Sequence, residues 1–442
     1  MKITFILPAI GKKKNEKYIG TWKMEPLTIA VLKALTPDDI ETEFFDDRIE
    51  LINFNTKTDL VAITVETYTA MRSYEIATKF REKGVRVIGG GYHVTLNQYE
   101  ALDYFDCIIT HNSEKIWGTV LSDFRNGTMK SLYVGNTGSS EIMPDRSIFK
   151  GKKYLPVSLV ETGRGCIHNC EFCAIAGFYK CSYFKRDINA IVRDIKNSPN
   201  KYFFIVDDNL VADTEHAKNI FKALIPLKIK WAGQGTLSMG NDKELLTLMK
   251  KSGCELILIG FESLETKNLK QMKKSWNNQM DTDILVQNIH DAGIGIYATF
   301  VLGYDSDTFE TINDTLNFAK KHNFFTAAFN HLLPFPGTNL YERLKTDRSL
   351  IFDKWWLDDN YKYGQLSFNP KNMKAEELSL AARNARKEFA KFPVVFRRGM
   401  AHMRRSSPSI WWLFWAINLR LGEEIDEKMY VPLGKNLDEY PK

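Results

Sequence analysis

The sequence feature that most restricts the fold is a regular alternation of short apolar runs with segments of helical periodicity. In the first part of the chain, strand-like runs occupy residues 2–8, 41–45, 59–65, 85–88 and 107–110. Helical patterns, such as residues 72–83, lie between them. Strands that alternate with helices favour a parallel sheet, because each helix returns the chain to the same edge. We therefore predict a doubly wound, Rossmann-like α/β domain over residues 1–135.

A second alternating series fills residues 155–345. Its strand candidates are residues 157–162, 202–206, 229–233, 255–259, 295–301 and 327–333, with five helical patterns between them. Six such units predict a partial (β/α)6 TIM-type barrel, whose functional side chains stand at strand ends. Residues 136–154 are predicted to be a linker, because Gly, Ser, Asn and Lys dominate there. Residues 346–442 predict a helical C-terminal region.

Composition excludes several classes of function. A net charge of +6 over 442 residues is too small to indicate a nucleic-acid partner. No apolar run reaches membrane-spanning length, and the chain begins with a strand pattern where a secretory signal would lie, so we expect a cytoplasmic protein. Three of the six cysteines fall within eight residues, which indicates a metal site in a reducing compartment. Cys107 and Cys254 adjoin apolar strands and are expected in the core.

The clustered cysteines form the segment Cys166-Ile-His-Asn-Cys170-Glu-Phe-Cys173, directly after the first barrel strand. Three thiolates on one loop can hold three irons of a 4Fe-4S cluster and leave the fourth iron open to a small-molecule chelator. Zinc, with His168 as a further ligand, and chance are the alternatives. The spacing does not match that of ordinary zinc-binding cysteine pairs.

This pattern, with Phe172 in its aromatic position, resembles the hallmark of the radical S-adenosylmethionine (radical SAM) enzymes. The resemblance implies that the open iron binds the amino and carboxylate groups of S-adenosylmethionine. It further implies that an electron from an external donor, such as flavodoxin or ferredoxin, cleaves this cofactor to methionine and a 5′-deoxyadenosyl radical. Phe172 is then one of the residues around the cofactor.

Polar residues at other strand ends fit the same resemblance. Asp207-Asp208-Asn209 ends the second barrel strand, where the family binds the cofactor's amino group, and Gln234 follows the third. Glu262 ends the fourth strand and is a candidate for contact with the ribose or the amino group. A carboxylate beside an ammonium forms a charge-assisted hydrogen bond, whereas a structural Asx turn is the alternative for the aspartates. The segment Pro334–Thr338 after the last strand resembles one that shapes the adenosine side of the pocket.

A doubly wound domain in front of a radical barrel resembles the cobalamin-binding domain of class B radical enzymes. The segments that carry this resemblance are Thr64–Ala70 and Gly89–Leu96. Glycines at a strand end let a flat macrocycle approach the backbone. The resemblance makes Thr64, Glu66, Gly90 and His93 candidates for the cobalamin site. The Asp-x-His-x-x-Gly motif is absent, so axial ligation by His93 stays open, and a scaffold role of the sheet is the alternative.

Two cofactors together imply a cobalamin-dependent radical enzyme that methylates an unactivated carbon. One S-adenosylmethionine would methylate the cobalamin, and a second would yield the radical that removes a hydrogen atom from the substrate. The alternatives are rearrangement, cyclisation or epimerisation without methyl transfer, and a non-enzymatic cobalamin or iron-sulfur carrier. The sequence names neither a catalytic residue beyond the cofactor ligands nor the substrate, which could be a small molecule, a lipid or a peptide.

The C-terminal region carries an unusual tryptophan-rich run, residues 409–415. It is apolar on nearly all sides, which predicts burial within the protein. The flanking arginines leave a peripheral contact with a membrane surface open, and such a contact would favour a lipid or pigment substrate. These arginines are Arg397, Arg398, Arg404, Arg405 and Arg420.

Overall fold

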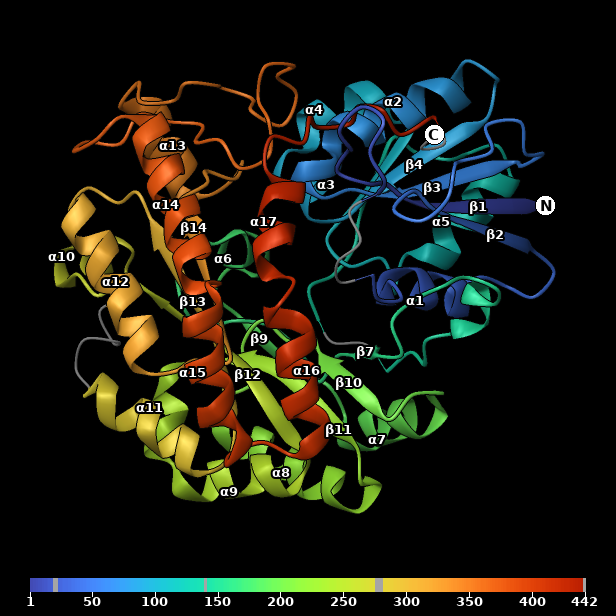
Figure 1. The fold of residues 1–442 in the computed structure, drawn as a ribbon. Coiled ribbons are helices and arrows are strands. Elements are labelled where there is room, and N and C mark those ends of the chain that lie inside the picture. The colour runs from blue at the N-terminus through green and yellow to red at the C-terminus, as the bar shows by residue number, and fades with distance from the viewer. Residues whose placement is uncertain (19–22, 139–140, 275–280, 440–442) are drawn as a thin grey trace.

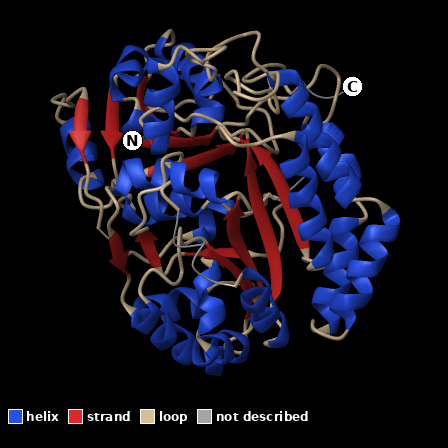
Figure 2. Cartoon of the chain, turned by 90° about the vertical axis from the view of Figure 1, so that its left-hand side faces the viewer, coloured by secondary structure: helices blue, strands red, loops and turns tan. Residues whose placement is uncertain are grey.

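The computed structural model describes residues 1–18, 23–138, 141–274 and 281–439. Two six-stranded parallel sheets follow one another along the chain, and the C-terminal helices pack beside the second (Figure 1). Figure 2 shows the strands of both sheets enclosed by helices. The fold is therefore α/β, as the alternating pattern predicts.

The first sheet has the strand order β2-β1-β3-β4-β5-β6 and all its pairs are parallel. The last strand lies just after the end of the regular pattern and was not predicted, because two of its three residues are exposed and form no apolar run. The strands are β1 (Lys2–Leu7), β2 (Glu41–Asp46), β3 (Leu60–Thr64), β4 (Arg86–Gly90), β5 (Cys107–Thr110) and β6 (Leu132–Val134).

Helices cover both faces of this sheet, which makes it doubly wound. One core joins Ile63 and Val87 to Phe80 of α2, and the other joins Phe5 to Trp117 of α5. The helices are α1 (Leu27–Leu35), α2 (Ala70–Arg81), α3 (Tyr92–Leu96), α4 (Gln98–Tyr104) and α5 (Trp117–Arg125), with short 3₁₀ helices η1 (Thr67–Thr69) and η2 (Arg146–Phe149).

The second sheet has the order β14-β13-β12-β11-β10-β7, also parallel, and forms the predicted partial barrel. Its strands are β7 (Ser158–Val160), β10 (Tyr202–Ile205), β11 (Lys230–Gly235), β12 (Cys254–Glu262), β13 (Gly295–Leu302) and β14 (Thr326–His331). A small antiparallel hairpin, β8 (Gly163–Gly165) and β9 (Tyr183–Lys185), encloses α6 (Ala174–Tyr179) and the cysteine segment.

Amphipathic helices connect the barrel strands. Most begin at a side-chain cap: Asp187, Asp213, Asp242, Asp281 and Thr308 each accept a hydrogen bond from a backbone N–H in the first turn. The helices are α7 (Ile188–Asn197), α8 (Thr214–Leu224), α9 (Lys243–Lys251), α10 (Thr266–Gln271), α11 (Thr282–Asp291) and α12 (Phe309–Lys321), with 3₁₀ helices η3 (Ile225–Leu227) and η4 (Leu237–Asn241).

The C-terminal region contains α13 (Asn339–Thr346), α14 (Ala375–Phe389), α15 (Phe392–Met403), α16 (Pro408–Asn418) and α17 (Leu421–Lys428). The chain then returns to the first domain, where Gly434 donates its N–H to the carbonyl of Ile10 at 2.7 Å. The segment 434–439 and the N-terminal strand β1 consequently lie in the same domain (Figure 1). The division at residues 135, 154 and 345 stays a proposal, and residues 139 and 140 of the predicted linker lie outside the described residues.

Candidate functional site

The three cysteines of the motif lie on the loop between β8 and α6. Gly165 enters this loop with φ +82°, and a Cβ there would come within 2.2 Å of the carbonyl oxygen of Ser182. Only glycine allows this turn without displacing the backbone of the neighbouring hairpin. Cys173 is the N-cap of α6, so its sulfur lies beside the N–H groups of the first helical turn.

The end of β10 holds this loop from one side. Asp207 accepts hydrogen bonds from the backbone N–H and the hydroxyl of Thr162, both at 2.6 Å, and is therefore a buried structural residue. Asp208 accepts the N–H of Gly165 at 2.9 Å, next to the first cysteine. Asn209 extends its side-chain N–H to within 3.8 Å of the Cys166 sulfur. Asp208 and Asn209 thus contact the loop near Cys166, while Asp207 fixes Thr162, which precedes β8.

An ion pair holds the loop from the other side. Arg343 of α13 donates two hydrogen bonds to the carboxylate of Glu171, at 2.7 and 3.2 Å. The backbone of Glu171 also bonds Met272 and Leu340. Charge-assisted, bidentate pairs fix orientation as well as distance. The pair was not predicted, because nothing local connects two residues that are 172 positions apart.

The three thiols are partly buried. Burial raises the pKa of all three thiols, that of Cys170 to about 12, and the ammonium of Lys274 opposes this effect at Cys170. Thiols of this kind lose their protons when a metal binds them. At Cys173 the N–H groups of Ile175 and Ala176 favour the anionic sulfur.

The cysteine segment offers three thiolates, and zinc and a 4Fe-4S cluster would need them at different separations. Two sulfur ligands of one zinc ion, each about 2.3 Å from the metal, lie within about 4.6 Å of each other. Within the ranges that the structure describes, no three His, Cys, Asp or Glu side chains converge in this manner. A 4Fe-4S cluster binds each thiolate through a different iron and therefore needs more widely spaced sulfurs.

The fourth strand end has an unusual backbone. Glu262 has φ +63° and follows an irregularity in the pairing of β12 with β13. A side chain with positive φ is uncommon and marks a constrained position. Its carboxylate pairs with the ammonium of Lys274 at 2.8 Å, and that ammonium also bonds the carbonyl of Gly260 at 2.9 Å. Lys274, which the sequence analysis missed, thus connects Glu262 with the cysteine loop.

Two further candidates line the barrel. Gln234 is half-buried near the end of β11, and Phe172 packs against the barrel core from the cysteine loop. The segment Pro334–Thr338 packs instead against the first domain, where a Cβ on Gly337 would lie 3.0 Å from Leu96. This segment therefore joins the two domains.

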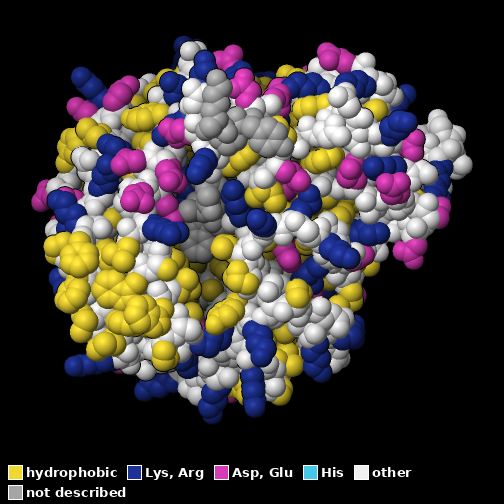
Figure 3. Space-filling view, turned by 45° about the vertical axis from the view of Figure 1, so that its right-hand side comes forward, with side chains coloured by type: hydrophobic (Ala, Val, Ile, Leu, Met, Phe, Trp, Pro, Cys, Tyr) yellow, Lys and Arg dark blue, Asp and Glu magenta, His cyan; other side chains and the backbone are white. Residues whose placement is uncertain are grey.

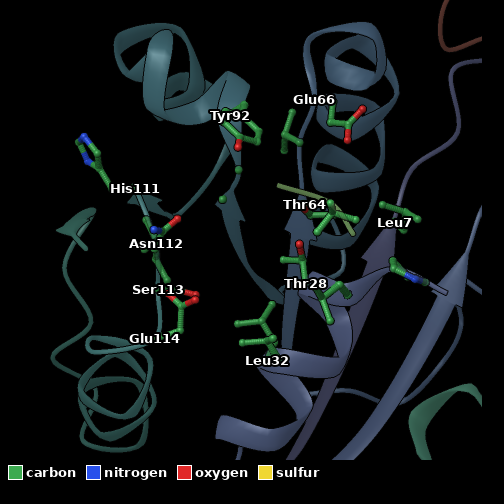
Figure 4. A pocket seen from close by; sticks show the side chains of 18 of the residues that line it. Leu7, Thr28, Leu32, Thr64, Glu66, Tyr92, His111, Asn112, Ser113 and Glu114 are labelled. Carbon is green, nitrogen blue, oxygen red and sulfur yellow. The ribbon is translucent and has the colours of Figure 1, made fainter. Parts of the chain in front are cut away.

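A cavity of about 470 Å³ lies between the carboxyl ends of the two sheets. Thr64, Glu66 and Gly90 line it from the first domain, and Asp208 and Arg164 line it from the barrel. Figure 4 shows Thr64, Tyr92 and the loop of Asn112 to Glu114 around this space. The structure thus brings predicted residues from both domains to one cavity.

Gly90, the last residue of β4, and Gly91, which follows it, have distinct surroundings. A Cβ on Gly90 would meet only the carbonyl of Ile109, at 3.7 Å, so the side facing the cavity is open. A Cβ on Gly91, where φ is +108°, would lie 2.7 Å from the carbonyl of Val65. Gly91 therefore fixes the turn, while Gly90 leaves room for a ligand.

Two electrostatic features shape the cavity wall. Arg164 pairs with Glu114 of the first domain at 2.5 Å and with Glu161 at 2.7 Å, which joins the domains at the cavity. Burial raises the pKa of Asp208 to about 6, and the hydrogen bond from Gly165 opposes this effect. Burial likewise raises the pKa of Glu66. Both carboxylates lie where a cationic or hydrogen-donating ligand would favour their charge.

His93 lies apart from the other residues proposed for the first-domain side of the cavity. Its side chain extends from α3, is fully buried and does not line the cavity. One ring nitrogen lies 3.3 Å from the Thr67 hydroxyl, and the other lies 3.0 Å from Tyr74 and 3.2 Å from Glu100. Partners within the first domain therefore occupy both ring nitrogens of His93 in this structure.

The comparisons identify the family. Residues 160–319 match the radical SAM superfamily. This segment belongs to the radical SAM superfamily. The radical SAM chain is 28% identical to bacteriochlorophyllide d C-12(1)-methyltransferase of Chlorobaculum tepidum over 426 residues, which are 92% of this chain and 90% of the relative. It is 27% identical to bacteriochlorophyllide d C-8(2)-methyltransferase of the same organism, over 74% of this chain and 78% of the relative.

The same architecture occurs in a solved structure. The radical S-adenosylmethionine methyltransferase TsrM from Kitasatospora setae, with cobalamin and a 4Fe-4S cluster bound, superposes with a TM-score of 0.63. The match covers 78% of this chain and 75% of TsrM at 15% identity, and therefore shows a shared fold. The chain is a radical SAM enzyme, and membership implies a 4Fe-4S cluster, S-adenosylmethionine and a source of electrons.

Proposed function

We propose that this radical SAM enzyme uses cobalamin to methylate an unactivated carbon of its substrate. The observation that carries the proposal is the single cavity lined by Thr64, Glu66 and Gly90 from one domain and by Asp208 beside the cysteine loop from the other. A methyl donor and a radical source must reach the same carbon, so their sites must share one space. The strand ends of the two sheets meet this requirement.

The first-domain side of the cavity fits a large flat ligand. Gly90 leaves its face open, and the lining combines apolar residues such as Leu7 and Leu32 with polar Thr64 and Glu66. A macrocycle with amide side chains needs apolar contact for its ring and hydrogen-bond partners at its edge. The bound cobalamin of TsrM, which shares this fold, supports the same choice.

The cofactors, when bound, supply the hydrogen-abstracting radical and the methyl group. The chain's own residues hold and orient them. Cys166, Cys170 and Cys173 would each bind one iron, and Asn209 would donate a hydrogen bond to the first sulfur. Asp208 and Glu262 are the proposed acceptors for the ammonium and ribose of S-adenosylmethionine.

The wall formed by Arg164 and Glu114 would limit the entry of water. Its ion pair spans the boundary between the domains and is largely buried. Exclusion of water protects a reactive radical from side reactions. We assign Arg164 this enclosing role, which requires no contact with the reacting atoms.

The substrate class is proposed from the relatives. Both curated relatives described above are named for methylation of a bacteriochlorophyllide d, a pigment. A large and mainly apolar ring system is therefore the first class to test, ahead of peptides and small polar molecules.

The deciding experiment is anaerobic turnover with S-adenosylmethionine that carries a deuterated methyl group. Reconstituted enzyme with cobalamin, a strong reductant and pigment extracts should give a product that contains the deuterated methyl, detected by mass spectrometry. A product without label would favour cyclisation or rearrangement. A chain that never cleaves S-adenosylmethionine under these conditions would be a carrier and would refute the proposal.

A further inference from the structure

The helices α15 and α16 present a large apolar face to solvent, which Figure 3 shows as a dense hydrophobic cluster. We call it the aromatic face. Phe392 is 63% exposed and Trp412 is 66% exposed, values unusual for such large apolar side chains. The strongly exposed residues of the face are Phe392, Phe396, Met400, Met403, Trp412, Leu413 and Leu419.

The aromatic face is continuous across the two helices. Ring contacts run from Phe392 to Phe396 at 6.1 Å between centroids, and from Phe396 to Trp415 at 6.3 Å. They continue from Trp415 to Trp411 at 5.9 Å and from Trp411 to Trp412 at 5.1 Å. A continuous apolar patch marks an interaction surface, whereas scattered apolar residues do not.

The inner side of the same helices is firmly packed, so the face cannot turn inward. Val395, Ile410 and Phe414 form a core with Phe325 of the barrel. Arg398 lies buried among them and donates hydrogen bonds to the carbonyls of Phe324, Phe325 and Phe389 and to Asn418.

Glycine brings the two helices close together. A Cβ on Gly399 would lie 2.5 Å from the Trp415 ring. Trp411 donates its indole N–H to the Gly399 carbonyl at 2.9 Å. The predicted burial of the tryptophan-rich run is thus correct for Phe414 and wrong for Trp412, because the run has one packed side and one exposed side.

The chain segment that forms the aromatic face carries only basic charges, and the acidic residue Glu388 beside it pairs with Lys391. Residues 389–422 contain six Lys and Arg residues and no Asp or Glu. Lys391, Arg397, Arg404 and Arg420 are exposed, and Arg398 is the buried residue described above. Long basic side chains at the border of an apolar surface can reach outward to negatively charged groups.

We propose that the aromatic face binds the surface of a bilayer that contains anionic phospholipids. Tryptophan and phenylalanine would enter the level between headgroups and acyl chains, and the arginines would contact the phosphates. None of the described helices has the length and hydropathy that a membrane crossing would need, so the attachment is peripheral. A second copy on this face would oppose two basic borders, which repel each other.

The test is vesicle sedimentation with the full chain. Wild type should sediment with phosphatidylcholine vesicles that contain about one third phosphatidylglycerol, and bind pure phosphatidylcholine at least about tenfold more weakly. Binding should decrease between about 50 and about 500 mM NaCl. Tryptophan fluorescence should shift to shorter wavelength with the anionic vesicles. No sedimentation with anionic vesicles would overturn the proposal.

Two double variants separate the apolar and the electrostatic contributions. Phe396→Ser with Trp412→Ser should abolish binding, and Arg397→Glu with Arg404→Glu should weaken it at least about twentyfold. Matched controls elsewhere are Phe309→Ser with Leu380→Ser and Arg193→Glu with Lys196→Glu, all of them exposed positions. Controls that lose binding equally would overturn the proposal. Light scattering would show whether the wild type is a dimer. A dimer that becomes monomeric in the apolar double variant would assign the face to contact with a second copy instead.

Discussion

The indole N–H of Trp356 donates a hydrogen bond of 2.9 Å to Glu100, a residue 256 positions earlier in the chain. The same carboxylate oxygen lies 3.0 Å from the Tyr74 hydroxyl, and Lys354 pairs with the carboxylate at 3.0 Å. Trp355 and Trp356 also belong to the apolar core of the first domain. The C-terminal region is therefore part of the structure that supports the proposed cobalamin site.

The free energy of unfolding should depend on pH through the carboxylate of Glu100. Burial acts to raise its pKa, but hydrogen bonds from His93, Trp356 and Lys354 outweigh this effect and hold the pKa at about 2. A lowered folded-state pKa gives stability that is present above the unfolded value and is lost as pH falls toward the folded value. Glu100→Gln should cost about 1–3 kcal/mol of unfolding free energy near neutral pH.

Urea unfolding at about pH 6 and about pH 3 would measure this dependence. The difference between wild type and Glu100→Gln should shrink at the lower pH, because the native carboxylate loses its advantage there. Equal differences at both pH values would contradict the assignment.

The cysteine motif predicts a sharp contrast between thiols. Cys170→Ala should lose the visible iron-sulfur absorbance and all cleavage of S-adenosylmethionine after anaerobic reconstitution. Cys254→Ala is the control, because Cys254 is fully buried in the barrel core and acts as a small apolar residue. The cluster assignment would fail if Cys170→Ala retained a complete iron content.

The Glu171–Arg343 pair should control how firmly the cluster is held. Arg343→Met removes both hydrogen bonds to the loop carboxylate without changing a cysteine. We expect iron release to a chelator to accelerate roughly tenfold, with partial recovery in Arg343→Lys. Unchanged release rates in both variants would show that other contacts suffice to hold the loop.

The carboxylate of Glu262 should contribute to cofactor affinity. Glu262→Gln keeps the shape but removes the charge, so the dissociation constant of S-adenosylmethionine should rise roughly ten- to a hundredfold at constant iron content. Asp208→Asn should act in the same direction, since Asp208 lines the cavity. Asp207→Asn should mainly lower stability, because both hydrogen bonds that its carboxylate accepts come from Thr162. Calorimetric titration would measure the changes in affinity, and urea unfolding would measure the change in stability.

Gly90 offers a matched pair of variants for cobalamin. Gly90→Ala should bind it normally, because the added Cβ makes only an ordinary contact with Ile109. Gly90→Trp should fill the open side and abolish the absorbance of bound cobalamin after desalting, while the cluster persists. Binding by the tryptophan variant would place cobalamin elsewhere.

The sequence predicts strand ends well, because apolar runs and the geometry of parallel sheets determine where each strand stops. It therefore predicts the placement of Thr64, Gly90 and Asp208. It does not predict the direction in which a side chain points, nor a pair between residues on different elements. His93 points away from the cavity because α3 begins just before it, at Tyr92. Lys274 acquires a role only through its partner Glu262, and no local pattern signals such a pair.

The C-terminal tail also has a consequence for biosynthesis. Asp438 pairs with Arg72, whose guanidinium is buried in the first domain beside Asp47, although 366 positions separate Asp438 from Arg72. At about 5–20 residues per second, ribosomal synthesis delivers Asp438 roughly 20–70 s after Arg72. During that interval the nascent first domain lacks the counter-ion Asp438, and for most of it the domain also lacks Trp355 and Trp356 of its core. We therefore expect the first domain to complete its folding only after the segment that contains Asp438 has been synthesised, which makes chaperone protection of the early segment important for expression.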